Sequence, residues 1–329
     1  MAIICTKGTW FASTLATVFV AGLASGGLAA EAPRGAEPGA QLIKQAFAQA
    51  EPRFEPAFER NCSLDAPFPL ANGRGGPAVP AKLFDNFYYV GRTDVGAWLI
   101  KTSGGLVLID TLYTAAEAEQ VIIPGIRKLG LDPDQIKMVL ITHNHLDHAG
   151  GISYFQKKGV PVMVSEQDWP ALGGAPGPSA ILHDRQVLTV GDTKITALHT
   201  PGHTPGTISY IFPVTQDGKR HMALLMGGVG PRGDAVVHAA TIASTERMLQ
   251  FGQAQGVDVL FQIHEAFEDP IAMQAILDAP TRRPGQPNPL VLGQQRFQNF
   301  GRMLQTCWRA RIEMMQAGRG PAGRGAGAP

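Results

Sequence analysis

Four side chains that can bind a metal ion fall within six consecutive residues. The segment reads His143-Asn144-His145-Leu146-Asp147-His148 and directly follows the apolar run 138–142. Imidazole and carboxylate groups at this density suit a borderline metal such as zinc. The apolar run is short and rich in β-branched residues, so it predicts a buried strand. The sequence therefore predicts a metal centre in the loop at the end of that strand.

Two further histidines fit the same centre. His203 lies in the sequence TPGHTPGT (residues 200–207), where two Pro-Gly pairs predict a rigid turn between two strands. His264 follows the apolar run 259–263, again at the end of an expected strand. The sequence thus offers six ligands for one centre. We expect the remaining histidines to be structural or solvated: His183, His199, His221 and His238.

The segments that must position these ligands alternate between strands and helices. Short β-prone runs lie at 87–90, 97–100, 106–109, 137–142, 160–165, 187–190, 193–198, 208–212, 222–226 and 258–263. Helical spacing is found at 115–129, 239–253, 271–277 and 290–315, and a short helix is expected around 41–50. Residues 165–181 are expected to form a long loop. This alternation predicts an α/β domain whose sheets are covered by helices.

The sequence predicts four parts of the chain. We expect a signal peptide at residues 1–30, an N-terminal extension and linker at 31–83, the domain at 84–316, and a disordered tail at 317–329. The tail is rich in Gly, Arg, Ala and Pro, which is a low-complexity composition.

The composition argues against two classes of protein, those that bind nucleic acid and those that cross the membrane several times. The chain has 329 residues, 44% of them hydrophobic, which is enough for a sizeable core. Its 28 basic and 27 acidic residues give a formal net charge of +1. This balance gives no electrostatic reason to expect a nucleic-acid partner. No central apolar run reaches the length of about 18 residues that a membrane-spanning helix needs, which argues against a polytopic membrane protein.

The first thirty residues indicate export. Lys7 is their one charged residue, an apolar stretch runs from Trp10 to Leu28, and small residues precede Glu31. This order is typical of a secretory signal peptide, and a retained membrane anchor is the alternative. Cleavage would leave a periplasmic or secreted protein without stable membrane association. Cys62 and Cys307 would then be the mature cysteines, either as a disulfide or as two separate thiols.

Taken together, the His143-x-His145-x-Asp147-His148 motif, the TPGHTPGT turn and His264 resemble the metallo-β-lactamase superfamily. The similarity extends from about Phe84 to Trp308. The sequence DNFYYVG (residues 85–91) and the form of the turn are most similar to class B metallo-β-lactamases of the third subclass. The resemblance implies a single four-layer αβ/βα sandwich, with metals at the edge between its two sheets.

The resemblance also implies a cofactor and a reaction. It assigns two zinc ions per chain, the first held by His143, His145 and His203 and the second by the remaining three ligands, Asp147, His148 and His264. It implies that a metal-bridging hydroxide, oriented by Asp147, opens the amide bond of a β-lactam without a serine nucleophile. The substrate would be this small molecule, and the protein would act as a monomer.

The sequence ALLMGG (residues 223–228) bears on the choice among related activities. Lactonase-like and glyoxalase II-like relatives carry a metal-bridging Asp at the end of this strand, and other lactamase subclasses carry a Cys ligand. This chain has neither. We align Met226 with a position that is Ser in most members of the third subclass. We therefore expect Met226 to line the substrate site, with the backbone N–H groups of Gly227 and Gly228 binding a substrate carboxylate.

Two other residues have alternative interpretations. Asp110 matches an Asp that recurs near the metal loop in the superfamily, where it would support the ligands, or it caps a helix over 114–129. Trp169 is either an exposed substrate contact or a buried core residue.

The expected activity is zinc-dependent hydrolysis of β-lactams. The alternative is a hydrolase of the same fold that acts on lactones, thioesters or other small esters. A flavodiiron-type redox protein is disfavoured because the first motif keeps its histidines and no flavin domain is evident. A non-catalytic binding protein is disfavoured because all six ligands are intact.

Overall fold

The computed structural model describes residues 37–64, 75–172, 177–228, 230–231 and 233–318. The chain divides into two compact units, residues 1–36 and residues 37–329. The expected signal peptide and residues 319–329 of the expected tail lie outside the described residues. None of the helices in the described ranges combines the length and apolar character that crossing a bilayer requires.

Two sheets form the centre of the described unit. The first has seven strands in sequence order: β1 Ala81–Phe84, β2 Phe87–Tyr89, β3 Trp98–Thr102, β4 Gly105–Ile109, β5 Ile136–Leu140, β6 Val162–Ser165 and β7 Ala180–Leu182. The second has five, in the order β12-β11-β10-β9-β8: β8 Gln186–Val190, β9 Thr193–His199, β10 Ile208–Gln216, β11 Lys219–Met226 and β12 Val257–Gln262. Pairing is parallel from β4 to β7 and between β11 and β12, and antiparallel elsewhere.

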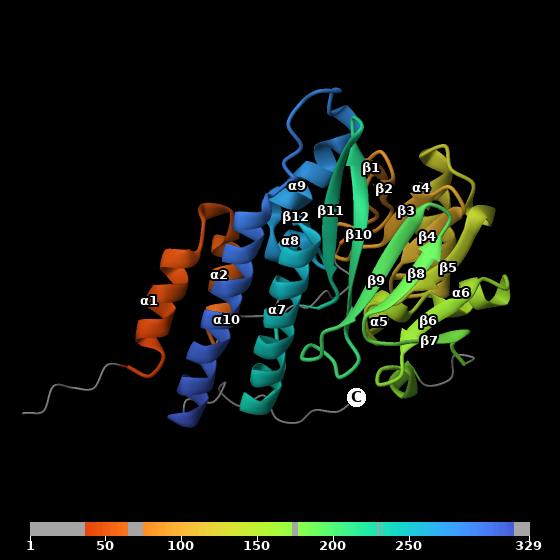
Figure 1. The fold of residues 1–329 in the computed structure, drawn as a ribbon. Helices are drawn as coiled ribbons and strands as arrows, with labels where there is room; N and C mark the ends of the chain where they lie inside the picture. The colour runs from red at the N-terminus through yellow and green to blue at the C-terminus, as the bar shows by residue number, and fades with distance from the viewer. Residues whose placement is uncertain (1–36, 65–74, 173–176, 229, 232, 319–329) are drawn as a thin grey trace, which may run out of the picture. The chain divides into compact units, whose positions relative to one another are not determined.

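Helices cover the outer face of each sheet (Figure 1). The helices are α1 Ala40–Gln49, α2 Glu55–Cys62, α3 Ala115–Glu117, α4 Ile123–Lys128, α5 Leu146–Ala149, α6 Ile152–Lys157, α7 Ala235–Gln255, α8 Glu265–Glu268, α9 Pro270–Asp278 and α10 Gln294–Gln316. A π-helical turn, Ala118–Ile122, joins α3 to α4. Short 3₁₀ turns lie at Pro52–Phe54, Pro133–Gln135, Trp169–Leu172 and Ala279–Thr281.

Strand alternation divides the apolar side chains among three cores. In β3, Trp98 and Ile100 pack between the two sheets, whereas Leu99 packs outward against the helices α4 and α6. In β11, Leu225 packs between the two sheets, whereas Leu224 packs outward against the helices α7 and α10. The layers are therefore helix, sheet, sheet, helix, which confirms the expected αβ/βα sandwich.

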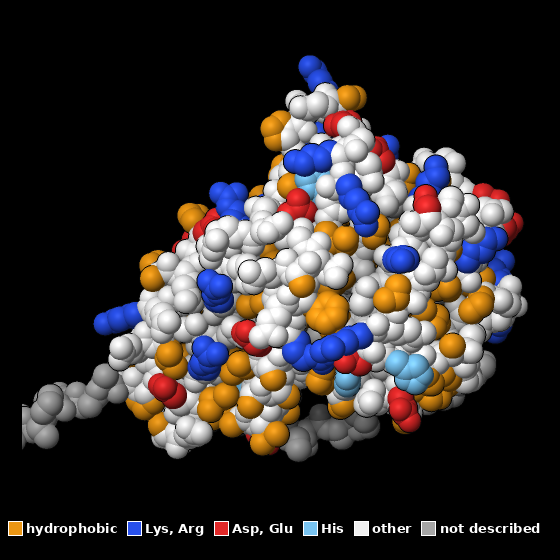
Figure 2. All heavy atoms as spheres, in the orientation of Figure 1, with side chains coloured by type: hydrophobic (Ala, Val, Ile, Leu, Met, Phe, Trp, Pro, Cys, Tyr) orange, Lys and Arg blue, Asp and Glu red, His pale blue; other side chains and the backbone are white. Residues whose placement is uncertain are grey.

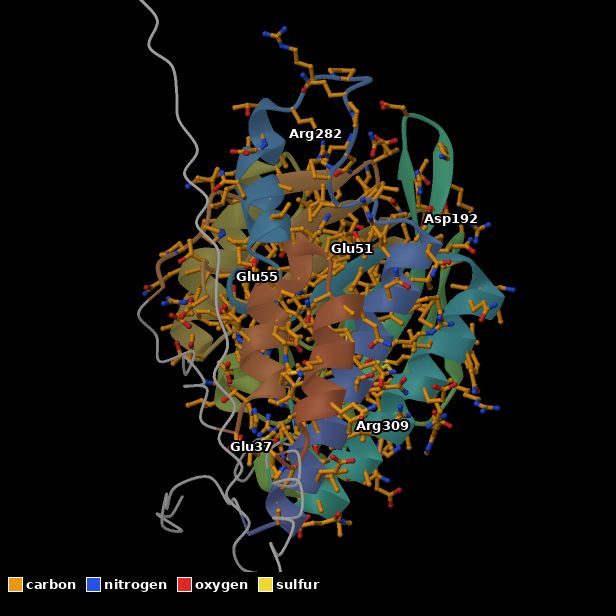
Figure 3. The ribbon with its side chains drawn as sticks, turned by 90° about the vertical axis from the view of Figure 1, so that its left-hand side faces the viewer. Glu37, Glu51, Glu55, Asp192, Arg282 and Arg309 are labelled. Carbon is orange, nitrogen blue, oxygen red and sulfur yellow. A yellow bond between two sulfur atoms is a disulfide. The ribbon has the colours of Figure 1, made fainter. Side chains whose placement is uncertain are left out.

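The helices α1 and α2 lie in the segment expected to be an N-terminal extension and linker. Both α1 and α2 pack on α10, where the Phe54 and Phe300 rings lie 4.7 Å apart. Figure 3 views this side of the molecule. Cys62 and Cys307 form a disulfide, which settles the alternative in favour of the bridge. Residues 37–62 thus share the core of the domain, because their apolar faces complete the covering of the second sheet.

Several boundaries also differ from the expected ones. β1 begins at Ala81, within the residues 31–83 expected to be the extension and linker, and pairs with β2. The segment 165–181 is not one continuous loop, since it contains the turn Trp169–Leu172 and the start of β7. Charged side chains on the face shown in Figure 2 are interspersed, and basic and acidic groups lie near one another, as the near-neutral composition indicates.

Candidate metal centre

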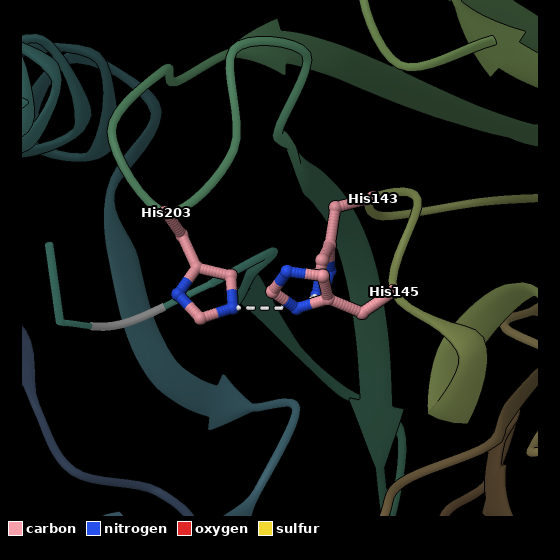
Figure 4. Close-up of side chains that lie close together, drawn as sticks. All are labelled: His143, His145 and His203. Carbon is pink, nitrogen blue, oxygen red and sulfur yellow. Dashed lines mark hydrogen bonds between the residues drawn. The ribbon is translucent and has the colours of Figure 1, made fainter. Parts of the chain in front are cut away.

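Three histidines from two loops converge beside the ends of the sheets. His143 and His145 lie between β5 and α5, and His203 lies in the turn between β9 and β10. Figure 4 shows their rings facing one another. His145 Nδ1 lies 2.9 Å from His143 Nε2 and 3.2 Å from His203 Nε2. The three ligand atoms lie within 4.8 Å of one another, as a shared ion requires.

A second group of three forms next to the first. Asp147 and His148 are on α5, and His264 is the residue that precedes α8, two residues after β12 ends. His148 Nε2 lies 3.2 Å from His264 Nε2. Asp147 Oδ2 lies 3.3 Å from His148 Nε2 and 3.4 Å from His264 Nε2. The structure therefore brings together all six residues that the sequence indicated, in the two expected groups.

The spacing of these atoms fits a tetrahedral metal. Bonds of about 2.0–2.1 Å from zinc to nitrogen or oxygen, at tetrahedral angles, place neighbouring ligand atoms about 3.3 Å apart. The contacts measured above run from 2.9 to 3.4 Å. The donor set and its spacing fit a metal ion at each group of three ligands.

Backbone carbonyls fix the orientation of two of the rings. His203 Nδ1 lies 3.1 Å from the carbonyl oxygen of Gly230, and His264 Nδ1 lies 2.8 Å from that of Asp94. A carbonyl can only accept, so Nδ1 donates in both rings and Nε2 is the nitrogen that carries the lone pair in the neutral ring. Each Nε2 therefore faces its triad ready to bind a cation.

The buried carboxylate of Asp110 orients ligands in the segment 143–148. Asp110, which is 0% exposed, accepts hydrogen bonds from the Thr142 backbone N–H at 2.8 Å and from His148 Nδ1 at 2.9 Å. The Thr142 hydroxyl donates to Asp110 and lies 3.1 Å from His143 Nδ1. Asp110 thus supports a ligand in each triad. The helix cap expected as its alternative role is supplied by Thr114, which accepts from the Glu117 N–H.

Burial and neighbouring charges shift the pKa values of the candidate ligands in both directions. Burial lowers the pKa of His143 well below its ordinary value, and the neighbouring imidazoles lower it further. Burial opposes the charged form of His148, but the carboxylates of Asp147 and Asp110 raise its pKa to about 10. Burial and then His148 lower the pKa of His264 to about 4. Burial would raise the pKa of Asp147, but His148 holds it well below its usual range.

The expected role of Met226 is contradicted by its position. Its side chain is 3% exposed and belongs to the apolar core between the second sheet and α7 and α10. The reason is strand alternation, which turns residue 226 to the same face as Leu224. The Gly227 N–H is also occupied, because it donates to Ser209 Oγ at 3.1 Å. Gly228 does lie beside the centre, where an added Cβ would come within 2.6 Å of His203 Cβ.

The other weaker candidates are largely structural. Trp169 is half-buried and packs against the core beneath the first sheet's helices. His221 pairs with Asp258 at 2.6 Å, His199 Nε2 donates to the Pro205 carbonyl, and His238 is buried on α7.

Asp168 also supports the site, and the sequence did not single it out. Asp168 is 0% exposed and accepts hydrogen bonds from both loops of the first triad. It lies three residues after β6 ends, in the segment expected to be a loop. A polar residue just beyond a buried strand is the signal that could have found it, as it found His143 and His264.

One protein-family model matches the part of the chain that carries most of the candidate ligands. The sequence model described as the metallo-beta-lactamase superfamily matches residues 90–216, which include five of the six candidate ligands. Residues 90–216 of this chain are thus similar to the metallo-β-lactamase superfamily.

Solved structures of this superfamily have the same fold. A subclass B3 metallo-β-lactamase of Bradyrhizobium japonicum is 27% identical with a TM-score of 0.61, over 74% of this chain and 97% of that one. A metallo-β-lactamase from Legionella gormanii is 25% identical with a TM-score of 0.61, over 76% of this chain and 99% of that one.

Curated relatives within the superfamily have other activities. A hydroxyacylglutathione hydrolase of Buchnera aphidicola is 30% identical over 131 residues, which are 40% of this chain and 45% of that protein. An N-acyl homoserine lactonase of Agrobacterium fabrum is 31% identical over 121 residues, 32% of this chain and 46% of that protein. The chain thus spans about half the length of these relatives. The superfamily match and the two groups of candidate ligands support a metal-dependent hydrolase.

Proposed function

We propose that this protein is a zinc-dependent hydrolase that opens the amide bond of β-lactams. The observation that carries the proposal is the composition of the second triad. His148, from the first motif, joins His264 and Asp147 there, while β11 ends at Met226 and is followed by two glycines instead of a metal-binding Asp or Cys. This is the ligand pattern that the resemblance associates with the third lactamase subclass. The likeness to a subclass B3 structure over nearly its whole length supports the same choice.

The two triads suit zinc, and two ions per chain are part of the proposal. When bound, zinc would polarise the carbonyl and lower the pKa of a water molecule toward neutrality. His143, His145 and His203 would hold the first ion, and Asp147, His148 and His264 the second. The low pKa of the Asp147 carboxyl keeps it ionised at neutral pH, so it can accept a hydrogen bond from the attacking water and orient it.

The surroundings of the triads would shape the substrate site. Leu146 lies between the ligands His145 and Asp147 and is 68% exposed. An apolar side chain left in water at this position offers a contact for an apolar substituent of the substrate. Gly228 lets the backbone pack directly against His203, because an added Cβ would come within 2.6 Å of His203 Cβ.

The second candidate function is hydrolysis of lactones or thioesters. The curated relatives favour it, since those compared above are a hydroxyacylglutathione hydrolase and a homoserine lactonase. The charges of the site give no reason to exclude the carbonyl of a lactone or a thioester. The same six ligands would support transfer of any of these acyl groups to water. The absence of a carboxylate at the end of β11 is the feature that ranks it second.

One panel of assays separates the two. Zinc-loaded protein is tested on a penicillin, a cephalosporin and a carbapenem beside a homoserine lactone and a glutathione thioester, with His145→Ala as the inactive control. We expect kcat/KM to be highest on a β-lactam. A value for the lactone or the thioester that exceeds every β-lactam would overturn the proposal in favour of the second function.

We also propose that the protein works in the periplasm or outside the cell. The Cys62–Cys307 disulfide supports this, because such bridges persist in oxidising compartments. Intact-mass measurement of protein from the secretory compartment tests it, and a species that still begins at Met1 there would count against cleavage after residue 30.

A further inference from the structure

Asp168 is a buried carboxylate that touches no candidate ligand and yet contacts both loops of the first triad. It follows β6, on the first sheet, and it is 0% exposed. Its own backbone N–H is 3.3 Å from Ser165 Oγ, which anchors the residue to the end of β6. A buried carboxylate is costly unless hydrogen bonds satisfy its oxygens. The question is therefore what those oxygens bind.

Three donors converge on this side chain. Oδ2 accepts from the Asn144 backbone N–H at 3.0 Å and from the Thr204 hydroxyl at 2.6 Å. Oδ1 accepts from the Gly206 backbone N–H at 2.7 Å. Asn144 lies between the ligands His143 and His145, whereas Thr204 follows the ligand His203. One carboxylate thus joins a loop of the first sheet to a turn of the second.

The turn is shaped around this carboxylate. An added Cβ at Gly206 would lie 2.6 Å from Asp168 Cγ and 2.1 Å from Ser165 Oγ, so the backbone approaches as closely as glycine allows. An ionised carboxylate can satisfy three donors because it only accepts. An amide would turn its NH₂ group toward one of them. The arrangement therefore requires Asp rather than Asn.

We propose that Asp168 is a positioning residue for the first triad. By fixing Asn144 and Thr204 to one point, it sets the separation of His143 and His145 from His203, and hence the affinity of that triad for a metal. The second triad depends on Asp110 and the Asp94 carbonyl instead. Asp168 should therefore act on the first triad alone. This role rests on the proposed metal centre, and it is independent of which substrate is hydrolysed.

The test measures zinc affinity of each triad in the full-length protein by competition with a chromophoric chelator. His264→Ala leaves only the first triad whole, and His145→Ala leaves only the second. Added to His264→Ala, Asp168→Asn should weaken zinc binding by about 10- to 100-fold, the usual effect of removing support for a ligand. In the His145→Ala background it should change zinc binding by less than about twofold.

Asp258→Asn is the matched control. Asp258 also joins two strands through its side chain, accepting from His221 Nδ1 and the Met222 N–H, but it lies at the end of β12 remote from His264. Asp258→Asn should lower the free energy of unfolding without changing zinc affinity in either background. Thr204→Val removes one of the three hydrogen bonds and should weaken the first triad by a smaller factor than Asp168→Asn. It also provides the test should Asp168→Asn not fold.

The outcomes are distinct. Equal zinc affinity with and without Asp168→Asn, or Thr204→Val, in the His264→Ala background would overturn the role of Asp168 and leave the metal centre standing. Equal weakening in both backgrounds would make Asp168 a general structural residue and overturn the proposal as well. A parent protein that binds no zinc would overturn the proposed function and this role together.

Discussion

Asp110 and His148 are joined by a 2.9 Å hydrogen bond, and both side chains are 0% exposed. Asp110 has φ of 63°, a left-handed conformation that is uncommon outside glycine. The strain is retained because this conformation lets one carboxylate reach both His148 and Thr142. The bond directs Nε2 of His148 toward Asp147 and His264. A residue that is not a ligand therefore orients a ligand of the second triad.

Asp110→Asn should therefore weaken zinc binding at the second triad. An amide can present its NH₂ group to His148 Nδ1, which favours the wrong imidazole tautomer. We expect an affinity about 10- to 100-fold lower for the second ion and a corresponding fall in kcat, measured by zinc titration and steady-state kinetics. Asp184→Asn, at an exposed carboxylate paired with Arg247, is the control. Unchanged zinc affinity in Asp110→Asn would contradict the orienting role.

Metal analysis should find two zinc ions per chain. A chelator should abolish hydrolysis and zinc should restore it. Because the pKa of His148 is about 10, this ring is protonated near neutral pH before metal binds, so binding at the second triad should release a proton. Calorimetric titration in two buffers of different ionisation enthalpy measures that release. A protein that takes up at most one ion in excess zinc would count against two sites.

Asp147→Asn should remove nearly all turnover while the fold survives. The substitution removes a charged ligand from the second triad, but the side chain contributes to none of the three apolar cores. We expect a loss of about 100-fold or more in kcat, with a circular dichroism spectrum like that of the parent. Activity within about threefold of the parent would contradict the assigned role.

The disulfide should stabilise the domain substantially. Cys62 and Cys307 are 245 residues apart in sequence, so the bridge restricts the unfolded chain over most of the domain. Replacing both by Ser should lower the free energy of unfolding by about 2–5 kcal/mol, measured by urea unfolding beside the oxidised parent. Reduction of the parent should give a similar change. A loss below about 0.5 kcal/mol would mean that the packing of α2 on α10 suffices without the bond.

Stability should fall as the pH drops from about 6.5 to about 4 because of His238. This side chain is 0% exposed, and burial, with a contribution from Arg311, lowers its pKa to about 4, although Asp234 raises it. Between these values the unfolded chain takes up a proton that the folded chain does not, so unfolding is favoured. The effect is at most about 3 kcal/mol. His238→Asn should flatten this part of the stability profile, and an identical profile would contradict the assignment.

The sequence by itself determined the six candidate ligands and the layered fold. His143, His145, Asp147 and His148 form a dense local motif, and His203 and His264 follow strands or turns that simple patterns identify. Such signals are local, because a ligand's chemical type and its place after an apolar run are written in a few neighbouring residues. The alternation of β-prone and helical segments fixed the class of fold for the same reason.

Only the tertiary structure decided what supports those ligands and what does not. Asp168 serves the first triad through hydrogen bonds to residues 24 and 36 positions away, a separation that no local pattern encodes. Met226, which alignment placed at the substrate site, turns into the core because β11 runs on in register beside β12. The packing of α1 and α2 on α10, and with it the disulfide, likewise depends on contacts between the two ends of the domain. Hydrogen bonds and packing between distant segments form only when the sheets are assembled, which is why these features lay beyond the sequence.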